Sequence, residues 1–424
     1  MKIPFKSPAR KRIVAVVAGV LAFLYVGFAG IQFLASWFGD RTDFAGGAEL
    51  SSLRRAAWLD PSNAEYRYHL GRYYDLVARD PNTAVLNYKQ AVDLNPHSAR
   101  YWFDLASAYQ VLGDTLHQTR ALERAIQADS MTPDVAWEAA NFYLVQGEND
   151  KALREFRVVI ANDHSDADQA LQFCWRINPD VDFIMRDVLP VRADSYASFL
   201  SLLESKGDTP GTMKAWDALI ATHDSFERKN SFDYIRYLIQ HKEVDQAVKV
   251  WRQTAERFGL NAYLPSSSNL VVNGNFSLDV LNAGFDWQYQ KQSSVNLTLD
   301  PSDFHSGRRS LLVTFDGPGI SDSGFYELVA VQPNTTYDFS AYYKNGELME
   351  GAGGPHFTIQ DMYSLEVYFE SDELKDAGFW KSVDGEFTTG PDCKLVVLHI
   401  RRLPAGSPIR GKLWVDDFRI TQKR

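Results

Sequence analysis

The feature that most constrains the fold of this chain is a repeat of about 34 residues between residues 64 and 164. Three sets of aromatic, apolar or small residues recur at intervals of 34 or 35: Tyr74, Tyr109 and Tyr143; Tyr88, Leu122 and Phe156; Ala91, Ala125 and Val159. Gly113 and Gly147 keep the same interval. A constant period of this length indicates a helical solenoid, in which neighbouring helix pairs bury their apolar faces against one another.

The residues at these offsets resemble the tetratricopeptide repeat. The first copy carries Leu70, Gly71, Tyr74, Ala84, Tyr88, Ala91 and Pro96, and the third carries Tyr143, Gly147, Ala152 and Phe156. We expect a truncated leading repeat at residues 50–60, a degenerate helix pair at 166–190 and two further repeat-like units ending near Phe258. Gly207 and Lys242 occupy matching turns of those two units. The predicted all-α solenoid covers residues 48–262.

The resemblance implies a concave surface, built from the first helix of each repeat, that binds a protein partner. The candidate partner-binding residues lie at first-helix positions and are Arg67, Tyr68, Arg72, Arg100, Tyr101 and Asp104. The alternative for each of them is an ordinary solvated residue with helical i,i+4 pairs. Four tryptophans fall on apolar stripes and are expected in the core: Trp102, Trp137, Trp216 and Trp251.

An apolar segment precedes the repeats. Residues 13–38 contain no charge over 26 residues, which exceeds the ~20 residues that a membrane-spanning helix needs. Five basic residues lie within residues 1–12, whereas two aspartates follow the segment within a short tether at 39–47. This asymmetry predicts a single-pass helix in a bacterial inner membrane, with a cytoplasmic N-terminus and a periplasmic bulk. The alternative is a cleaved signal peptide, because Gly27-Phe28-Ala29 has small residues at a suitable cleavage spacing.

The composition changes at a polar linker, residues 263–268, which opens a C-terminal domain over residues 269–424. Short alternating or β-branched segments, separated by Gly, Pro and Asn, predict an all-β sandwich or jelly roll. The expected strands are 310–315, 325–331, 337–343, 365–369, 395–400 and 412–420. The predicted fold class is therefore multidomain: a transmembrane helix, an all-α tetratricopeptide-like solenoid and an all-β jelly-roll sandwich.

Four segments of this domain resemble, in order and spacing, the carbohydrate-binding jelly-roll modules of many plant-polysaccharide hydrolases. They read NLVVNGNF at 269–276, HSGRRSL at 305–311, VQPNTTY at 331–337 and LWVDDF at 413–418. The resemblance implies glycan binding. It also implies a structural calcium near the opening strand and the closing aspartates, for which Asp417 is the candidate ligand beside backbone carbonyls. Ser277 departs from the family, which usually has an acidic residue there.

Sugar recognition requires an aromatic surface with polar groups around it, and strand alternation suggests where to look. If Phe339 and Ala341 point into the sandwich, Tyr342 points out. If Leu365, Val367 and Phe369 point in, Glu366 and Tyr368 point out. If Val396, Leu398 and Ile400 point in, His399 and Arg401 point out. We expect one outer sheet face to display Tyr342, Glu366, Tyr368, His399 and Arg401, the alternative being an ordinary solvated face.

Little in the sequence indicates catalysis or nucleic-acid binding. The net charge of −10 argues against a polyanionic ligand. The chain has no nucleophile elbow, no phosphate-binding loop and no His-Glu-x-x-His motif. Asp361, Glu366 and Glu370 could supply a pair of glycosidase carboxylates, but their separation is not encoded in the sequence. We therefore expect a protein that is not an enzyme.

The domain combination predicts an adaptor. The anchor fixes its location, the repeats bind a protein partner and the sandwich binds a glycan. By analogy we expect it to act in exopolysaccharide or cell-envelope polysaccharide assembly or export. The alternatives are a purely protein-binding scaffold with a structural sandwich, and an enzyme that cleaves or modifies glycans.

Overall fold

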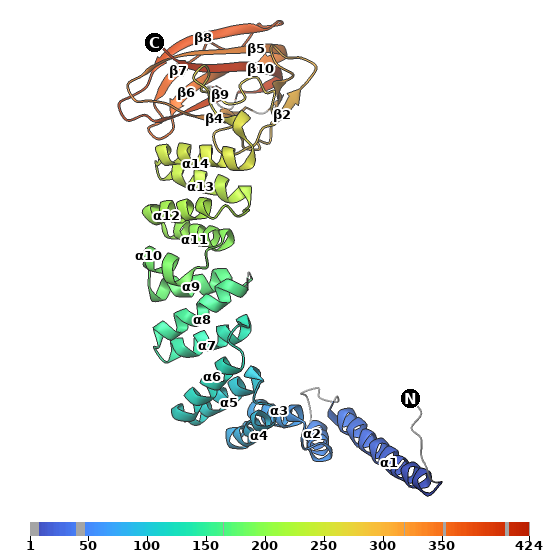
Figure 1. Ribbon diagram of the computed structural model, residues 1–424. Coiled ribbons are helices and arrows are strands. Elements are labelled where there is room, and N and C mark those ends of the chain that lie inside the picture. The colour runs from blue at the N-terminus through green and yellow to red at the C-terminus, as the bar shows by residue number, and fades with distance from the viewer. Residues whose placement is uncertain are drawn as a thin grey trace. The chain divides into compact units, whose positions relative to one another are not determined.

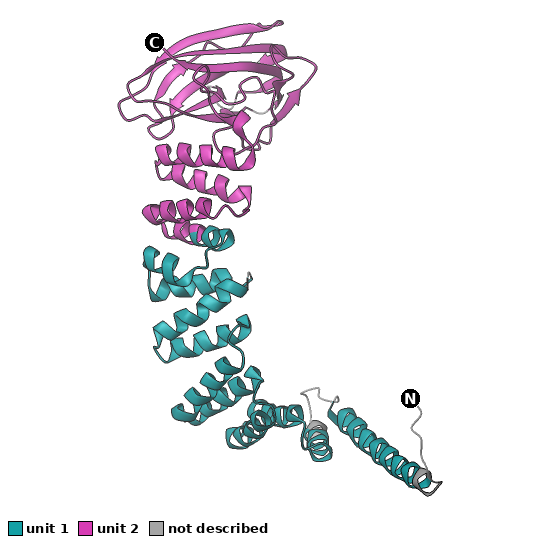
Figure 2. Ribbon diagram, in the orientation of Figure 1, with its two compact units in different colours: residues 1–199 teal, residues 200–424 magenta. Residues whose placement is uncertain are grey.

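A computed structural model describes residues 8–39, 47–163, 165–317, 319–350, 353–402 and 407–423 (Figure 1). The chain divides into two compact units, residues 1–199 and 200–424 (Figure 2). The basic residues Lys2 and Lys6 and the aspartates of the predicted tether, Asp40 and Asp43, lie outside the described residues.

The first unit is helical. One helix, α1, is long and apolar enough over Arg12–Gly39 to cross a membrane, and a signal sequence would satisfy the same criteria. The helices are α1 (Pro8–Gly39), α2 (Gly47–Leu59), α3 (Ala64–Arg72), α4 (Pro81–Leu94), α5 (Ala99–Leu112), α6 (Thr115–Ala128), α7 (Pro133–Val145), α8 (Asn149–Asn162), α9 (Ala167–Ile177) and α10 (Val181–Phe183). Two π-helical turns, Tyr73–Val77 and Ile184–Val188, follow α3 and α10.

Local sequence signals explain where these helices begin and end. Asp80 and Asp114 accept hydrogen bonds from backbone N–H groups in the first turns of α4 and α6. Gly113 and Gly147 end α5 and its counterpart α7 at φ values of +72° and +76°, which glycine adopts without steric cost. The small residues that recur at intervals of 34, Ala91 and Ala125, are fully buried between helices. The prediction of tetratricopeptide-like helix pairs is confirmed.

The second unit begins within α11 (Ala193–Lys206). It continues through α12 (Thr209–Ala221), α13 (Arg228–Gln240), α14 (Val244–Phe258) and a short 3-10 helix, Asn261–Tyr263. Gly207 and Lys242 stand in the two matching turns with φ values of +70° and +65°, as their equivalence predicts. Trp216 and Trp251 are buried in the helical core.

The rest of the second unit is a sandwich of two five-stranded antiparallel sheets, which confirms the predicted fold class. The sheet that we call the β9 sheet has the strand order β1-β4-β9-β6-β7, and the β10 sheet has the order β2-β3-β10-β5-β8. The strands are β1 (Gln288–Tyr289), β2 (Val295–Asp300), β3 (Ser310–Gly317), β4 (Asp322–Ala330), β5 (Thr336–Glu350), β6 (Pro355–Asp361), β7 (Val367–Glu370), β8 (Lys381–Thr388), β9 (Leu395–Arg402) and β10 (Ile409–Gln422).

The core between the sheets contains the residues that alternation places inside, including Phe339, Ala341, Val396, Leu398 and Ile400. Trp287 belongs to the same core and is 1% exposed. The expected inward direction of Leu365 and Val367 is wrong, because β7 begins only at Val367 and its pairing with β6 is irregular at that residue. Leu365 has a φ of +61° and is 64% exposed.

Candidate functional site

The five predicted glycan-binding residues do not share one face. Tyr342 lies on β5, which pairs with β10 and β8 in the β10 sheet. His399 and Arg401 lie on β9, which pairs with β4 and β6 in the other sheet. The expectation of a single face is therefore wrong for Tyr342, because alternation predicts whether a side chain points outward but not which sheet its strand joins.

Tyr342, Glu366 and Tyr368 lie apart from His399 and Arg401, the two predicted residues on β9. The ring of Tyr342 is stacked under His305, with centroids 3.5 Å apart and an interplanar angle of 13°. Glu366 is exposed and precedes β7. Tyr368 packs against the sandwich core, where burial raises its pKa to about 12.

His399 and Arg401 belong to a polar group on the outer face of the β9 sheet. Register places Tyr326 of β4 and Thr358 of β6 on either side of His399. His399 Nδ1 is 2.8 Å from Asp322 Oδ2, and Arg401 Nη1 donates to Gln360 Oε1 at 3.1 Å. His399 and Thr358 are 6% and 1% exposed.

Three atoms of this polar group are buried without a hydrogen-bond partner among the described residues: His399 Nε2, Thr358 Oγ1 and Arg401 Nε. Buried polar atoms in folded proteins are nearly always hydrogen bonded, and an unsatisfied one costs about 1–3 kcal/mol. Three such atoms on adjacent strands of one sheet face therefore mark places that an ordered water or a polar ligand would satisfy.

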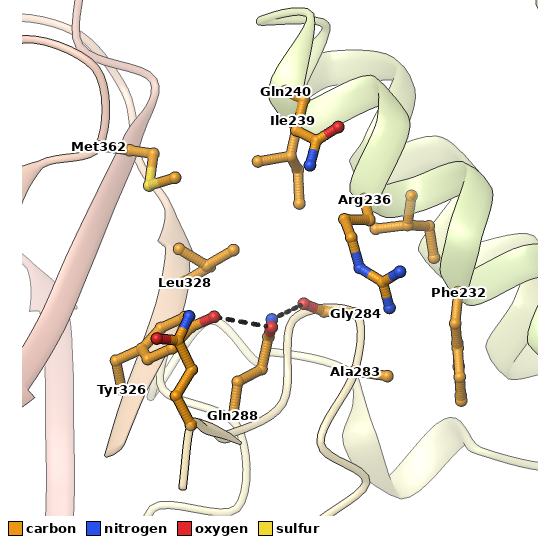
Figure 3. Close-up of a pocket in the computed structure, with 12 residues that line it drawn as sticks. Phe232, Arg236, Ile239, Gln240, Ala283, Gly284, Gln288, Tyr326, Leu328 and Met362 are labelled. Carbon is orange, nitrogen blue, oxygen red and sulfur yellow. Dashed lines mark hydrogen bonds between the residues drawn. The ribbon is translucent and has the colours of Figure 1, made fainter. Parts of the chain in front are cut away.

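A cavity of about 270 Å³ lies between the β9 sheet and α13, and Tyr326, the neighbour of His399, lines it. Figure 3 shows Arg236 and Gln240 of α13 on one side and Tyr326, Leu328 and Met362 of the sandwich on the other. The cavity volume is near the lower end of the ~300–1,000 Å³ typical of small-molecule sites.

A chain of two hydrogen bonds fixes the floor of this cavity. The Tyr326 hydroxyl donates to Gln288 Oε1 at 3.1 Å, and Gln288 Nε2 donates to the Gly284 carbonyl at 2.9 Å (Figure 3). Burial raises the pKa of Tyr326, so this hydroxyl stays protonated at neutral pH.

The last helices also hold the sandwich directly. The Tyr363 hydroxyl donates to the Ile239 carbonyl at 2.8 Å, and Lys394 Nζ lies 2.5 Å from Asp245 Oδ2. The Lys242 ammonium lies 5.5 Å from the centre of the Tyr363 ring. Part of the β9 sheet face is therefore covered by α13 and α14 of the same unit.

Sequence reasoning missed Tyr326, Asp322, Thr358, Gln360 and Arg236. Tyr326 lies outward on a strand that was predicted, so alternation was a signal that would have found it. The strand that carries Thr358 and Gln360 was not predicted. The contact between Asp322 and His399 joins residues 77 apart, and no local pattern encodes it.

Five of the six predicted partner-binding residues form one cluster on α3 and α5. The Tyr68 hydroxyl donates to Asp104 Oδ2 at 2.7 Å, and its ring stacks on Tyr101 with centroids 4.4 Å apart. The guanidinium groups of Arg72 and Arg100 lie 5.9 Å and 5.4 Å from the centre of the same ring. Burial, together with the hydrogen bond to Asp104, raises the pKa of Tyr68. Arg67, on α3, is half-buried.

The residues around Asp417 do not fit a calcium ion. Asp417 Oδ1 accepts hydrogen bonds from Arg419, and Asp417 Oδ2 is 3.5 Å from His305 Nδ1. In the opening segment, the carbonyl of Phe276 accepts from Arg309 Nε at 2.8 Å. The guanidinium groups of Arg419 and Arg309 thus occupy oxygens that calcium would require. Among the described residues, no group of three or more His, Cys, Asp or Glu side chains has a metal-binding arrangement.

The acids considered for catalysis have local structural roles or face solvent. Asp361 Oδ1 accepts from the N–H groups of Tyr363 and Ser364 and so stabilises the turn after β6. Glu366 and Glu370 are exposed near the ends of β7.

Comparison with known proteins finds similarity in both parts of the chain. A family model described as "Carbohydrate binding domain" matches residues 268–404, so the C-terminal domain is similar to that family. Among curated proteins, none matches this chain.

Solved structures resemble parts of the chain. A structure titled "CBM4 structure and function" is 15% identical and has a TM-score of 0.28, covering 36% of this chain and 98% of its own. The CBM22-1 xylan-binding domain from Paenibacillus barcinonensis Xyn10C is 15% identical with a TM-score of 0.25, covering 35% and 91%. MamA is 23% identical with a TM-score of 0.27, covering 45% and 94%.

Proposed function

We propose that this protein is a membrane-anchored adaptor. In this account α1 spans a bacterial inner membrane, the repeats bind a protein partner and the sandwich binds a glycan on the periplasmic side. The match to a carbohydrate-binding family and the tetratricopeptide-like helix pairs support the two binding roles. The combination of an anchor with these domains suits assembly or export of an exopolysaccharide or cell-envelope polysaccharide.

The observation that carries glycan binding is the group of unsatisfied buried atoms on the outer face of the β9 sheet. His399 Nδ1 faces the Asp322 carboxylate, so in the neutral ring Nδ1 carries the proton and Nε2 is an acceptor. Arg401 Nε is a donor, and Thr358 Oγ1 both donates and accepts. All three atoms are buried in this structure, so the proposed site requires the side chains around them to move before sugar hydroxyls, which are donors and acceptors in one group, pair with them.

Tyr326 adds the apolar contact that a sugar ring requires. It stands beside His399 on the same face, lines the 270 Å³ cavity, and its hydroxyl is held by Gln288. Arg236 and Gln240 reach the cavity from α13, so the site we propose uses residues from both the last repeat and the sandwich (Figure 3).

A glycan array of the full-length protein in detergent tests this proposal. The variants are Tyr326→Ala and, as a matched control on the other sheet, Tyr342→Ala. We expect the wild type and Tyr342→Ala to bind the same glycan, and Tyr326→Ala to lose about tenfold in affinity, which corresponds to ~1.4 kcal/mol. Loss in Tyr342→Ala alone would move the site to the β10 sheet.

The packing of the β9 sheet against α13 and α14 favours a second candidate, a protein-binding scaffold in which the sandwich is structural. The contacts of Tyr363 with Ile239 and of Lys394 with Asp245 are its support. A wild-type protein that binds no glycan on the array would favour this alternative. We propose no catalytic activity for either candidate.

A further inference from the structure

The end of α1 is built into the first repeat of the solenoid. Ala35 is fully buried in one apolar cluster with Leu53 of α2 and Tyr66 of α3, and Phe38 packs against that cluster. A Cβ atom at Gly39 would lie 2.5 Å from Tyr66 Cε1, so helix and repeat are in close contact there. The contact begins within the apolar segment itself.

The length of α1 places this contact at the surface of a bilayer. The candidate membrane span Arg12–Gly39 has 28 residues, whereas a hydrocarbon core of ~30 Å takes about 20. Twenty residues counted from Ile13, next to the basic N-terminal segment, end at about Gln32. Ala35 and Phe38 then lie about 5–9 Å beyond the hydrocarbon at ~1.5 Å per residue, at the depth of the lipid headgroups.

The outer side of α2 suits that environment. Leu53, Ala56 and Ala57 are buried, whereas Arg54, Arg55 and Trp58 are exposed, and Trp58 is 79% exposed. Arg54 and Trp58 are four residues apart and share a face of the helix. The Arg55 guanidinium lies 5.6 Å from the centre of the Phe38 ring, so Arg55 borders the end of α1, while Arg54 Nη2 donates to the Tyr74 hydroxyl at 2.5 Å.

Tryptophan and arginine are the side chains that a membrane interface favours. An indole ring is most stable between hydrocarbon and water, and a guanidinium pairs with phosphate through two parallel hydrogen bonds. We propose that Arg54, Arg55 and Trp58 bind the phosphate and glycerol region of the leaflet from which α1 emerges. Through these contacts, the first repeat lies against the membrane surface. This inference rests on the proposed role of α1 as an anchor.

Site-specific labelling of the full-length protein in nanodiscs of phosphatidylcholine and phosphatidylglycerol tests the proposal. Both native cysteines, Cys174 and Cys393, are buried, so an introduced exposed cysteine is labelled selectively. A polarity-sensitive fluorophore is attached to Trp58→Cys or to the control Leu116→Cys, whose native side chain is 60% exposed on α6. Quenching by lipids with a nitroxide headgroup is then measured.

We expect the label at position 58 to be blue-shifted and quenched several-fold more than the label at position 116. Adding Arg54→Gln and Arg55→Gln should reduce that difference several-fold. Equal quenching at the two positions in protein that floats with the nanodiscs would overturn the inference and leave the anchor intact. Protein that fails to float with lipid would overturn the anchor as well.

Discussion

Gly284 of the sandwich lies directly against the indole ring of Trp251 in α14. A Cβ atom at Gly284 would overlap with Cζ3 of this ring, and Gly284 has a φ of +64°. The Trp251 Nε1–H donates to the Tyr263 carbonyl at 3.1 Å, which fixes the ring in place. The last helix and the sandwich are therefore in close contact at Gly284, where only a glycine leaves room for the Trp251 ring.

The Gly284→Ala variant should loosen this junction. Gly259→Ala is the matched control, because Gly259 has a φ of +69° but open space around its Cβ position. We expect Gly259→Ala to cost about 1 kcal/mol through backbone strain, and Gly284→Ala about 1–3 kcal/mol more through overlap with Trp251. Hydrogen exchange of α14 and of residues 281–287 measures the difference. Equal hydrogen-exchange rates in the two variants would contradict a close contact between Gly284 and Trp251.

A buried acid should make the stability of the sandwich depend on pH. Burial raises the pKa of Asp286 to about 7. Glu327 lies nearby and is fully buried, and burial raises its pKa as well. Because the folded pKa of Asp286 exceeds the unfolded value of about 3.9, the folded state binds the proton more tightly. Its contribution to stability is complete below pH ~4 and is lost as pH rises toward 7.

The Asp286→Asn variant tests this pH dependence, and its amide oxygen can still accept the hydrogen bond that Asp286 Oδ2 receives from the Leu281 N–H. Thermal unfolding of the full-length protein is followed from pH 4 to pH 8. We expect the variant to lose less stability over this range than the wild type, with Glu327 and Asp416 supplying the remaining slope. Identical slopes would show that Asp286 does not titrate in the folded protein.

Tyr68→Phe should weaken the packing of α3 against α5. The substitution removes the hydroxyl that donates to Asp104 and leaves a half-buried carboxylate without it. Loss of a hydrogen bond to a charged group costs about 1.5–3 kcal/mol. Hydrogen exchange in α3 and α5 should accelerate accordingly.

Tyr101→Phe is the control for this comparison, because the Tyr101 ring stacks on Tyr68 and its hydroxyl has no hydrogen bond among the described residues. Both variants keep the stacked rings, so similar exchange rates in the two would mean that the bond from Tyr68 to Asp104 does not stabilise the cluster.

The helical part was readable from the sequence because its signals are local and repeat. Lys242 illustrates this: its place in the period predicts the turn that Gly207 makes, although the side chain does not favour a φ of +65°. Six of the ten described strands of the sandwich were also predicted from alternation, whereas β1, β2, β6 and β8 were not. Even the cluster around Tyr68 follows from helix positions one repeat apart.

The glycan site was less readable because it depends on long-range pairing. Tyr342 and His399 both point outward, yet hydrogen bonding assigns their strands to different sheets. The unsatisfied atoms of His399, Arg401 and Thr358 come together only when β9 pairs with β6. The contact of Asp322 with His399 and the position of Arg236 beside the cavity also depend on this long-range packing.

The most direct test of glycan binding at the β9 sheet is calorimetric titration of Thr358→Val with the glycan selected on the array. Thr358 Oγ1 has no partner among the described residues, so valine removes a buried unsatisfied hydroxyl and keeps the shape of the side chain. We predict that the variant is as stable as the wild type or more stable by about 1–3 kcal/mol, yet binds the glycan about tenfold more weakly. Unchanged affinity in a protein that is more stable would contradict a glycan at this face.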